Sequence, residues 1–450
     1  MPTLNATHDS KLRSWVESSN DPATDFPVQN LPWCTFAAGE GKPPVPGVAI
    51  GDRVFDLAAL HAAKMLDGVE GVAFAPGFQV NDIAQLSGAA RGGLRARLVD
   101  LFRADTRTLQ DSPALLAAAR FFVKDVTFSL PCKIRNYTDF YASIHHAGTV
   151  GAMFRPDNPL LPNYKHVPIG YHGRASSLIA GGVDVRRPSG QQAPPEDAPA
   201  KGPTFGPCKM LDYELEVGCV IARGNALGIP IPVSAAREHV LGLCLVNDWS
   251  ARDLQKWEYQ PLGPFLAKNF ATTVAPFVVS LEALEPFRCP GWPRGEGDPS
   301  PLPYLSDEQD HAEGGIDITL EVHLQSQNMK AAGAAPMKIS SGKGFKEMYW
   351  TFAQMIAHHT SNGCNLQPGD LLASGTVSGP EATARGCMLE LTWDGAGKPR
   401  KPITLPTGET RNFLGDGDEV IIKGYCEKAG FRRVGFGECR GKIVGALGAG

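Results

Sequence analysis

Apolar and polar residues alternate over several stretches of the chain, which predicts strands with one buried face. The clearest stretch is residues 316–325, where every second residue from Ile316 to Leu324 is apolar and the residues between them are polar. Residues 48–55 predict a hairpin, and the almost wholly apolar run 243–249 predicts a buried strand that ends on an acid. Most of the sequence therefore fits a fold rich in strands.

Helical spacing of apolar residues is rarer. It occurs over residues 94–102 and again over residues 345–359, where Gly363 can end the helix. Two further segments have the composition of surface loops: residues 189–207 are rich in proline and alanine, and residues 288–303 are rich in glycine and proline. We expect short helices and long loops between the strands.

A chain of 450 residues is longer than one hydrophobic core usually supports, so two domains are expected. Residues 1–128 contain few residues suited to chemistry and predict a separate N-terminal module. In residues 129–450, polar, aromatic and glycine residues are much denser. The function is therefore expected in the second domain.

Charge and cysteine content narrow the class of protein. The 43 basic and 47 acidic residues give a net charge of -4 without long runs of one sign, which argues against nucleic acid and anionic membranes as partners. Residues 1–20 lack the apolar core of a secretory signal, and no stretch is apolar enough to span a membrane. The ten cysteines include no C-x-x-C pair and are expected to be reduced thiols. We expect a cytoplasmic protein.

Three acids lie close together in residues 211–220, where alternation places Asp212, Glu214 and Glu216 on one face of a strand. A solvated strand face explains such a pattern in many sequences, but acids that repel each other also gather around a cation. Asp248 ends the apolar run 243–249, and a carboxylate there needs a partner. If these acids converge, their all-oxygen ligand set favours Mg²⁺ or Ca²⁺ over zinc.

Several blocks in order resemble the catalytic domain of the fumarylacetoacetase family. The first blocks are YTDFY at 137–141, His146, MFR at 153–155 and GYHGRASS at 170–177. The later blocks are DYELEV at 212–217, NDWSARD at 247–253, WEY at 257–259, PLGPF at 261–265 and ASGTVSGPE at 373–381. So many matches in one order are not expected by chance.

This resemblance implies a mainly β (α+β) fold, with a small N-terminal SH3-like barrel before a large mixed β-sandwich roll. It also implies a homodimer acting on a small β-diketo acid. The implied reaction is hydrolysis of 4-fumarylacetoacetate to fumarate and acetoacetate, the last step of tyrosine and phenylalanine catabolism. The family's divalent ion, Mg²⁺ or Ca²⁺, would fall on Asp139, Glu214, Glu216 and Asp248, with further cation contacts at Lys268 and Thr272. Asp212 is not expected to be a ligand.

The catalytic roles also follow from the resemblance, and the residue types suit them. His146 would be the general base, because an imidazole can take a proton from water near neutral pH, and Glu390 would orient it. Arg252, Gln255 and Lys268 would stabilise the oxyanion; the first two share a face if residues 251–257 form a helix. The implied substrate contacts are Tyr141, Arg155, Tyr171, Gln255, Tyr259 and Thr376.

Two alternatives stay open at this stage. A related hydrolase acting on an acylpyruvate would share the metal chemistry, although such relatives generally lack the N-terminal module. A non-catalytic calcium-binding structural protein would use only the acids and would leave His146 and Glu390 without a role. The chain also departs from the family near Lys268, where Ala267 and Ala271 replace common glycines. That departure leaves the second cation site open and predicts a backbone without positive φ there.

Overall fold

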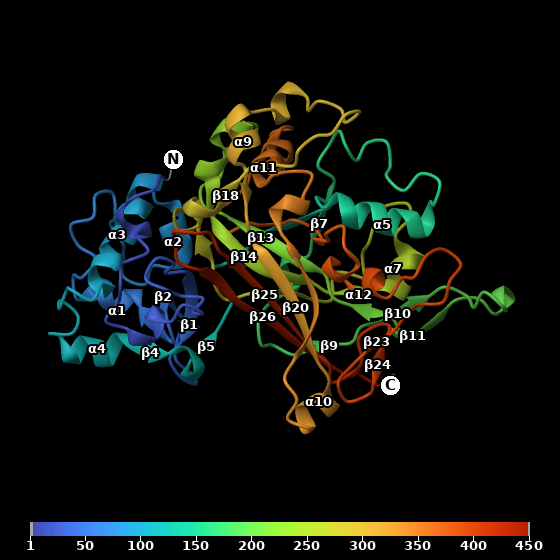
Figure 1. Cartoon of the computed structure of the whole chain (residues 1–450), viewed down its shortest axis with the longest axis horizontal. Coiled ribbons are helices and arrows are strands. Elements are labelled where there is room, and N and C mark those ends of the chain that lie inside the picture. The colour runs from blue at the N-terminus through green and yellow to red at the C-terminus, as the bar shows by residue number, and fades with distance from the viewer. Residues whose placement is uncertain (1–2, 449–450) are drawn as a thin grey trace.

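The computed structural model describes residues 3–448 as a mixed α and β protein with a small N-terminal domain and a larger second domain (Figure 1). The first domain contains an antiparallel sheet of order β4-β3-β2-β1-β5. Its strands are β1 (Trp33–Ala37), β2 (Val45–Ile50), β3 (Arg53–Asp56), β4 (Arg120–Phe122) and β5 (Thr127–Phe128). Its helices are α1 (Leu57–Ala62), α2 (Val80–Gln85), α3 (Gly88–Phe102) and α4 (Pro113–Ala119).

The second domain is built on two sheets. The larger sheet has the order β7-β6-β22-β13-β14-β16-β8, with β17 beside β14. Its strands are β6 (Tyr137–Phe140), β7 (Gly170–Gly173), β8 (Leu178–Ala180), β13 (Leu215–Ile221), β14 (Val240–Asp248), β16 (Thr272–Val274), β17 (Val279–Ser280) and β22 (Leu371–Ala373). The second sheet, of order β21-β20-β25-β26-β9, contains β9 (Val185–Arg186), β20 (Thr319–Gln325), β21 (Met337–Lys343), β25 (Glu419–Cys426) and β26 (Val434–Val444).

Short helices and strand pairs complete this domain. The helices are α5 (Ile144–Phe154), α6 (Val233–Ala236), α7 (Arg252–Glu258), α8 (Leu281–Leu284), α9 (Glu308–Glu313), α10 (Gln327–Ala331), α11 (Phe352–Thr360) and α12 (Met388–Leu391). The strand pairs are β10 (Ser189–Gln192) with β11 (Thr204–Pro207), β12 (Leu211–Asp212) with β15 (Ser250–Ala251), β18 (Arg288–Cys289) with β19 (Gly315–Ile316), and β23 (Ile403–Thr404) with β24 (Thr410–Arg411). No helix among residues 3–448 combines the length and apolarity that crossing a bilayer requires.

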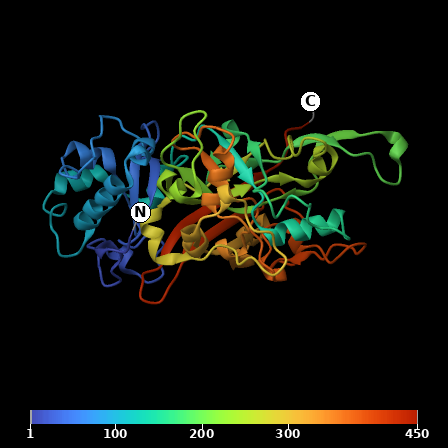
Figure 2. The same ribbon diagram turned by 90° about the horizontal axis from the view of Figure 1, so that it is seen from above.

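The two faces of the larger sheet are covered by different partners. One face packs against the second sheet, where Val217 and Leu245 share a buried cluster with Leu320 and Ile422. The other face packs against the N-terminal domain: Val220, Leu241 and Val246 belong to one cluster with Val48, Leu94 and Leu98. The N-terminal domain therefore packs directly against part of the larger sheet (Figure 2). The expected architecture, a small β domain before a large mixed β domain, is confirmed.

Several predicted elements are confirmed. The hairpin at residues 48–55 is the β2–β3 pair, helix α3 buries Leu94 and Leu98, and β14 ends on Asp248. The alternation in β20 gives alternating burial along the strand. The predicted strand at 316–325 is nevertheless interrupted, because Asp317 donates its backbone N–H to Phe287 and β20 begins only at Thr319.

The helix predicted over residues 345–359 is wrong in its first half. Residues Phe345–Glu347 form one 3-10 turn, and α11 begins at Phe352. The start is fixed by a capping box, in which Thr351 accepts from the Gln354 N–H and the Gln354 side chain accepts from the Thr351 N–H, both at 3.1 Å. Phe345 is buried in this single turn, so the apolar spacing of this part of the sequence reflects burial and not an α-helix.

The loop predicted at residues 189–207 is also wrong in part. Its two ends pair as the antiparallel strands β10 and β11, and only the proline-rich residues between them form the tip. This hairpin projects from the body of the domain in both ribbon views (Figures 1 and 2). The residues that follow Cys289 in the second predicted loop are mainly irregular up to Leu302, as expected.

Candidate functional site

Four carboxylates from three segments of the chain meet at the larger sheet. Asp139 lies on β6, Glu216 on β13, Glu214 just before β13, and Asp248 at the end of β14. One carboxylate oxygen from each lies within 4.8 Å of the others. The strand order explains this meeting, because β22 pairs with both β6 and β13, and β13 pairs with β14. The carboxylates are buried, so they do not form a solvated strand face.

Asp212 is not part of this group, although the alternation placed it beside Glu214 and Glu216. The predicted single strand is broken at Tyr213 and Glu214: β12 pairs with β15, whereas β13 pairs with β14 and β22. The Glu214 N–H donates instead to the Asn247 side chain at 3.1 Å. This break turns Asp212 away from the carboxylate cluster.

The carboxylate cluster is short of positive charge. Both oxygens of Glu216 and one oxygen of Asp139 are buried without a hydrogen-bond partner among the described residues. Burial, reinforced by repulsion from Asp139 and Asp248, raises the pKa of Glu216 well above its ordinary value. Burial and the charge of Asp248 likewise raise the pKa of Asp139. Such a site favours binding of a cation, which would satisfy the unpartnered oxygens and remove the repulsion.

Two basic side chains neutralise one part of the cluster. Lys268 donates to Glu214 and, at 2.9 Å, to Asp248, and Arg252 contacts Glu214 at 2.8 Å. Burial raises the pKa of Glu214, but Lys268 and Arg252 outweigh burial and hold the pKa below its ordinary range. Asp248 accepts two further bonds, from the Thr272 hydroxyl at 2.5 Å and the Tyr171 hydroxyl at 2.8 Å. Glu216 and Asp139 therefore form the open side of the cluster.

The backbone near Lys268 has no positive φ at Ala267 or Ala271. Among the described residues, only Leu31 and Lys64 combine a side chain with positive φ. Ala267 is fully buried and Ala271 nearly so. The backbone prediction is confirmed, because the extra methyl groups occupy ordinary conformations.

His146 and Glu390 form a buried pair beside the cluster. The His146 Nδ1 lies 2.7 Å from Oε2 of Glu390, although the residues are 244 positions apart in sequence. Burial raises the pKa of Glu390, but the charge and hydrogen bond of His146 outweigh it and lower the pKa below its ordinary value. Because an ionised carboxylate only accepts, the Nδ1 of His146 carries a proton and donates it to Glu390. The Glu390 oxygen also accepts from the Ser378 hydroxyl at 2.6 Å, which fixes its orientation.

Arg252 and Gln255 lie on one face of α7, as the spacing predicted. The Arg252 Nη1 donates to the Gln255 side-chain oxygen at 3.1 Å, while its Nη2 is buried without a partner among residues 3–448. A buried guanidinium N–H of this kind is available to an anionic group. The Gln255 amide nitrogen is left to bind a ligand.

The residues predicted to contact the substrate are less closely connected to the carboxylate cluster than the basic side chains described above. The Tyr141 ring packs edge-on against His146 with centroids 5.5 Å apart, and Tyr259 follows α7. Arg155 ends α5 and is exposed, with a 3.2 Å bond to the Pro159 carbonyl. Thr376 is buried just beyond β22. No hydrogen bond joins Arg155 or Thr376 to the carboxylate cluster in the described part of the chain.

The sequence analysis missed three residues that contact the site. Ser378 and Cys387 both donate to Glu390, and Tyr137 lies two residues before Asp139 on β6, with its hydroxyl buried and unpartnered among the described residues. Ser378 and Tyr137 lie in the blocks 373–381 and 137–141 that carry the family resemblance, so that signal could have identified them. For Cys387, no signal in the sequence pointed to the site.

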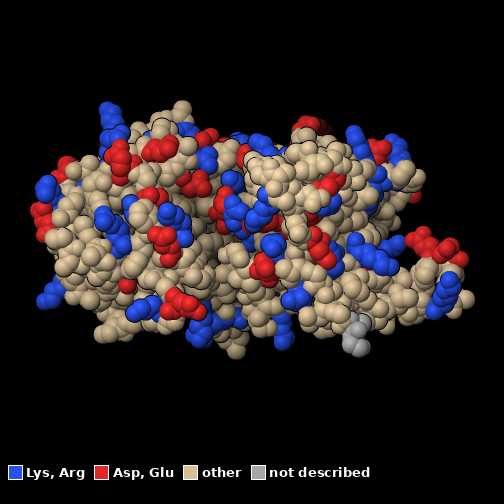
Figure 3. Space-filling view, turned by 90° about the horizontal axis from the view of Figure 1, so that it is seen from below, with Lys and Arg blue, Asp and Glu red and all other residues tan. Residues whose placement is uncertain are grey.

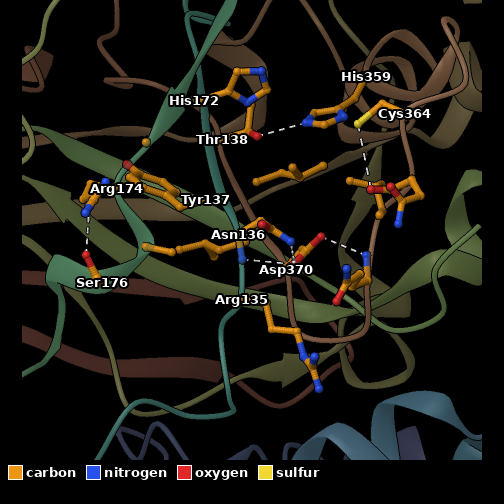
Figure 4. A pocket seen from close by; sticks show the side chains of 17 residues that line it. Arg135, Asn136, Tyr137, Thr138, His172, Arg174, Ser176, His359, Cys364 and Asp370 are labelled. Atoms are coloured by element: carbon orange, nitrogen blue, oxygen red, sulfur yellow. Dashed lines mark hydrogen bonds between the residues drawn. The ribbon is translucent and has the colours of Figure 1, made fainter. Parts of the chain in front are cut away.

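A cavity of about 580 Å³ lies near the cluster but is distinct from it. Its lining includes Arg135, His172, Arg174 and His359, and the Thr138 hydroxyl bonds to His359 at 2.9 Å (Figure 4). Because neighbours on a strand face opposite ways, Thr138 is directed away from the cluster that Asp139 joins. None of the predicted site residues lines this cavity.

Basic and acidic side chains are interspersed over the face of the molecule shown in Figure 3. The buried carboxylates of the site are not part of that surface, because Glu216 and Asp248 are fully buried. Charge at the candidate site is therefore a local property of the cluster.

Comparison with known proteins gives matches over almost the whole chain. The family model for "Fumarylacetoacetate (FAA) hydrolase C-terminal" matches residues 134–444, and the model for "Fumarylacetoacetase N-terminal" matches residues 29–131. The chain is 47% identical over 438 residues to the fumarylacetoacetase of Bos taurus, covering 96% of this chain and 99% of that protein. The Homo sapiens fumarylacetoacetase is 47% identical, with 94% and 97% covered. The fumarylacetoacetase of Oryza sativa subsp. japonica is 45% identical, with 97% and 98% covered.

Proposed function

Because the chain belongs to the fumarylacetoacetate hydrolase family, we propose that the buried carboxylates and the His146–Glu390 pair form its catalytic site. The protein is a hydrolase that cleaves the carbon–carbon bond of 4-fumarylacetoacetate to give fumarate and acetoacetate, in tyrosine catabolism. The identity to fumarylacetoacetases over nearly the full length of both chains supports this activity. The observation that carries the proposed site is the meeting of four buried acids beside a buried imidazole–carboxylate pair.

The carboxylate cluster fits a divalent metal ion. All four candidate ligands are oxygens, as Mg²⁺ and Ca²⁺ prefer, and the unpartnered oxygens of Glu216 and Asp139 are the atoms that such an ion would satisfy. We propose Asp139, Glu214, Glu216 and Asp248 as its ligands, with Lys268 and Thr272 as neighbours that hold Asp248. When bound, the dication would polarise the keto oxygens of the substrate and supply positive charge for the enolate that leaves.

His146 is positioned to act as the general base. Its Nε2 takes a proton from water, and the resulting hydroxyl group bonds to the carbonyl carbon of the substrate. Glu390 holds the ring in the required tautomer and stabilises the imidazolium through the Nδ1 bond. When the carbon–carbon bond breaks, its electron pair remains on the acetoacetate fragment, whose carbon then takes the proton back from the imidazolium.

The oxyanion that forms at the attacked carbonyl needs donors that are already in place. The unpartnered Nη2 of Arg252, the Gln255 amide and the Lys268 ammonium are the candidates. Tyr141, Arg155, Tyr171, Tyr259 and Thr376 remain the proposed substrate contacts. Arg155 is the residue best suited to a carboxylate of the substrate, because a guanidinium can form two parallel bonds to it.

Turnover and metal dependence can be tested in one assay. The purified protein is mixed with fumarylacetoacetate and with an acylpyruvate, and the loss of substrate absorbance is followed before and after EDTA treatment. We expect rapid loss of fumarylacetoacetate only, abolished by EDTA and restored by Mg²⁺ or Ca²⁺. Conversion of the acylpyruvate alone would contradict the proposed substrate, and activity unaffected by EDTA would contradict the metal site.

We also propose that the protein is a homodimer. Exposed apolar side chains, here called the mouth patch, lie near the proposed substrate residue Tyr259, either in sequence or, for Phe154, through a ring 6.3 Å from the Tyr259 ring: Phe154, Trp257, Leu262, Phe265 and Leu266. Leu262 is 96% exposed and Phe265 is 67% exposed, which is costly for a monomer in water and favours a second copy as cover. Light scattering should give twice the chain mass, and Leu262→Asp should lower it. Leu227→Asp, at an exposed leucine outside the mouth patch, should not.

The proposed location is the cytoplasm. All ten cysteines are unpaired thiols, most of them buried, as expected for a protein of a reducing compartment. Thiol titration of protein prepared without reductant should count ten free thiols after unfolding, and a lower count would contradict this location.

A further inference from the structure

Asp212 is a fully buried carboxylate that lies outside the proposed ligand set, yet it has more donors around it than most acids of the chain. Its Oδ1 accepts from the backbone N–H groups of Tyr213 at 2.9 Å and Met388 at 2.8 Å. Its Oδ2 accepts from the Leu389 N–H and from Arg252 Nε, both at 3.0 Å. Asp212 thus connects β12 with two different helices.

Each of these helices carries a residue of the proposed site. Met388 and Leu389 are the first two residues of α12, which has no side-chain cap from its own Cys387, so Asp212 supplies the missing acceptor from outside. The next residue of α12, Glu390, contacts His146. On α7, Arg252 contacts Asp212 through Nε and Glu214 through Nη1, which leaves Nη2 unpartnered.

We propose that Asp212 is a positioning residue for the hydrolysis: one carboxylate sets the guanidinium of Arg252 and the helix of Glu390 relative to each other. The oxyanion donor and the oriented base must act on the same substrate, so their relative placement affects the rate more than the binding of the substrate. This inference rests on the proposed roles of Arg252, Glu390 and His146.

The Asp212→Asn variant tests the proposal because it changes charge and acceptors but hardly changes shape. Both oxygens of Asp212 accept two N–H groups each, so either orientation of the amide directs its NH₂ group against two donors. Either orientation breaks one of the two bonds to α12, and the neutral amide holds the Arg252 guanidinium less strongly than the carboxylate even where its oxygen faces Nε. We expect kcat to fall about 10²-fold, the cost of misplacing a catalytic group by about 1 Å, while KM stays within about threefold.

Asp418→Asn is the matched control. Asp418 is also fully buried, and its two oxygens accept from Arg411 and from the Gly415 N–H. Its amide variant suffers the same conflict of donors, but no hydrogen bond joins the Asp418 side chain to a proposed site residue within residues 3–448. Both variants should lower the melting temperature, and only the Asp212 variant should lower kcat of the folded enzyme.

A double-mutant cycle tests whether Asp212 affects kcat through Arg252. Arg252→Gln and Asp212→Asn should each reduce kcat, and their combination should be at least about tenfold more active than the product of the two losses, because both act through one guanidinium. If Asp212→Asn does not fold, Asp212→Glu takes its place, since it keeps the charge but moves the oxygens by about 1.5 Å. It should also lower kcat.

The outcomes separate the inference from the roles on which it rests. Unchanged kcat in Arg252→Gln and Glu390→Gln would remove the proposed roles of those residues. If those variants lose activity, the inference about Asp212 is overturned by any of three results: kcat of its variant within about threefold of the parent, a loss equal to that of Asp418→Asn, or strictly multiplicative losses in the cycle.

Discussion

The charge imbalance of the carboxylate cluster gives a prediction whose sign depends on the metal. The change is Glu216→Gln, which removes a buried charge with almost no change of volume. Both Glu216 oxygens lack partners, and burial together with the neighbouring Asp139 raises the pKa of Glu216. The substitution should therefore stabilise the metal-free protein and weaken binding of the metal.

The size and pH range of the expected stabilisation of the metal-free protein follow from the coupling between proton binding and folding. A carboxyl group with a raised pKa in the folded state binds its proton more tightly there than in the unfolded chain. The metal-free protein therefore loses stability as the pH rises above about 4, the ordinary pKa of a glutamate, until the raised pKa is passed. Holding one such carboxyl protonated at pH 7 costs up to about 4 kcal/mol. Glu216→Gln removes this cost, so its advantage should grow between pH 4 and pH 7.

In the presence of the metal, the parent protein should be more stable than Glu216→Gln. Loss of a direct ligand should weaken the affinity for Ca²⁺ by at least about 10²-fold, or about 2.8 kcal/mol, because even indirect partners of metal ligands account for up to about that factor. The affinity is measured by calorimetry and the stability by thermal unfolding with EDTA and with excess Ca²⁺. Glu321→Gln, at a partly exposed acid of β20, is the control and should leave the affinity unchanged.

Two results would refute this reasoning. If Glu216→Gln binds Ca²⁺ as tightly as the parent, Glu216 is not a ligand. If the metal-free variant is less stable than the parent at pH 7, the buried Glu216 carboxyl group does not destabilise the folded protein. Some other interaction would then stabilise its unpartnered oxygens.

Three further predictions concern the reaction. His146→Ala should lower kcat by about 10²-fold or more while the protein stays folded, whereas His145→Ala, whose ring pairs with Glu347 at 3.0 Å, should keep nearly the parent kcat; equal losses would remove His146 from its role. Arg155→Ala should raise KM about tenfold, the loss of one charge-assisted bond, with kcat little changed, as steady-state kinetics would show; a change in kcat alone would contradict a binding role. Dialysis against EDTA should lower the melting temperature, and added Mg²⁺ or Ca²⁺ should restore it; an unchanged melting temperature would contradict a cation at the cluster.

Patterns among neighbouring residues in the sequence predicted individual strands. The alternation around Glu216 and the apolar run ending on Asp248 each identified a strand and the position of an acid on it. Periodicity cannot reveal which strands become neighbours in a sheet. Only the family resemblance therefore predicted that Asp139 belongs with the other three acids. The pairing of His146 with Glu390, 244 positions apart, is likewise invisible to local reasoning.

The errors in the predicted fold have physical causes. The apolar spacing of residues 345–349 is typical of a helix, but the capping box at Thr351 sets a later start. Composition alone suggested a loop at residues 189–207, whereas paired backbone groups at both ends form a hairpin. The break between Asp212 and Glu216 shows how one interrupted ladder separates acids that a regular strand would keep together.

The shared cluster of the two domains means that the N-terminal domain is a permanent partner of the catalytic sheet. Val220 lies on the same face of β13 as Glu216, and it packs in one cluster with Leu94 and Leu98 of the first domain. A substitution such as Leu98→Ala, far from any reacting atom, would leave a cavity under that sheet. Cells carrying it would hold fewer working enzyme molecules, each with ordinary catalytic constants, so the defect would be one of protein abundance.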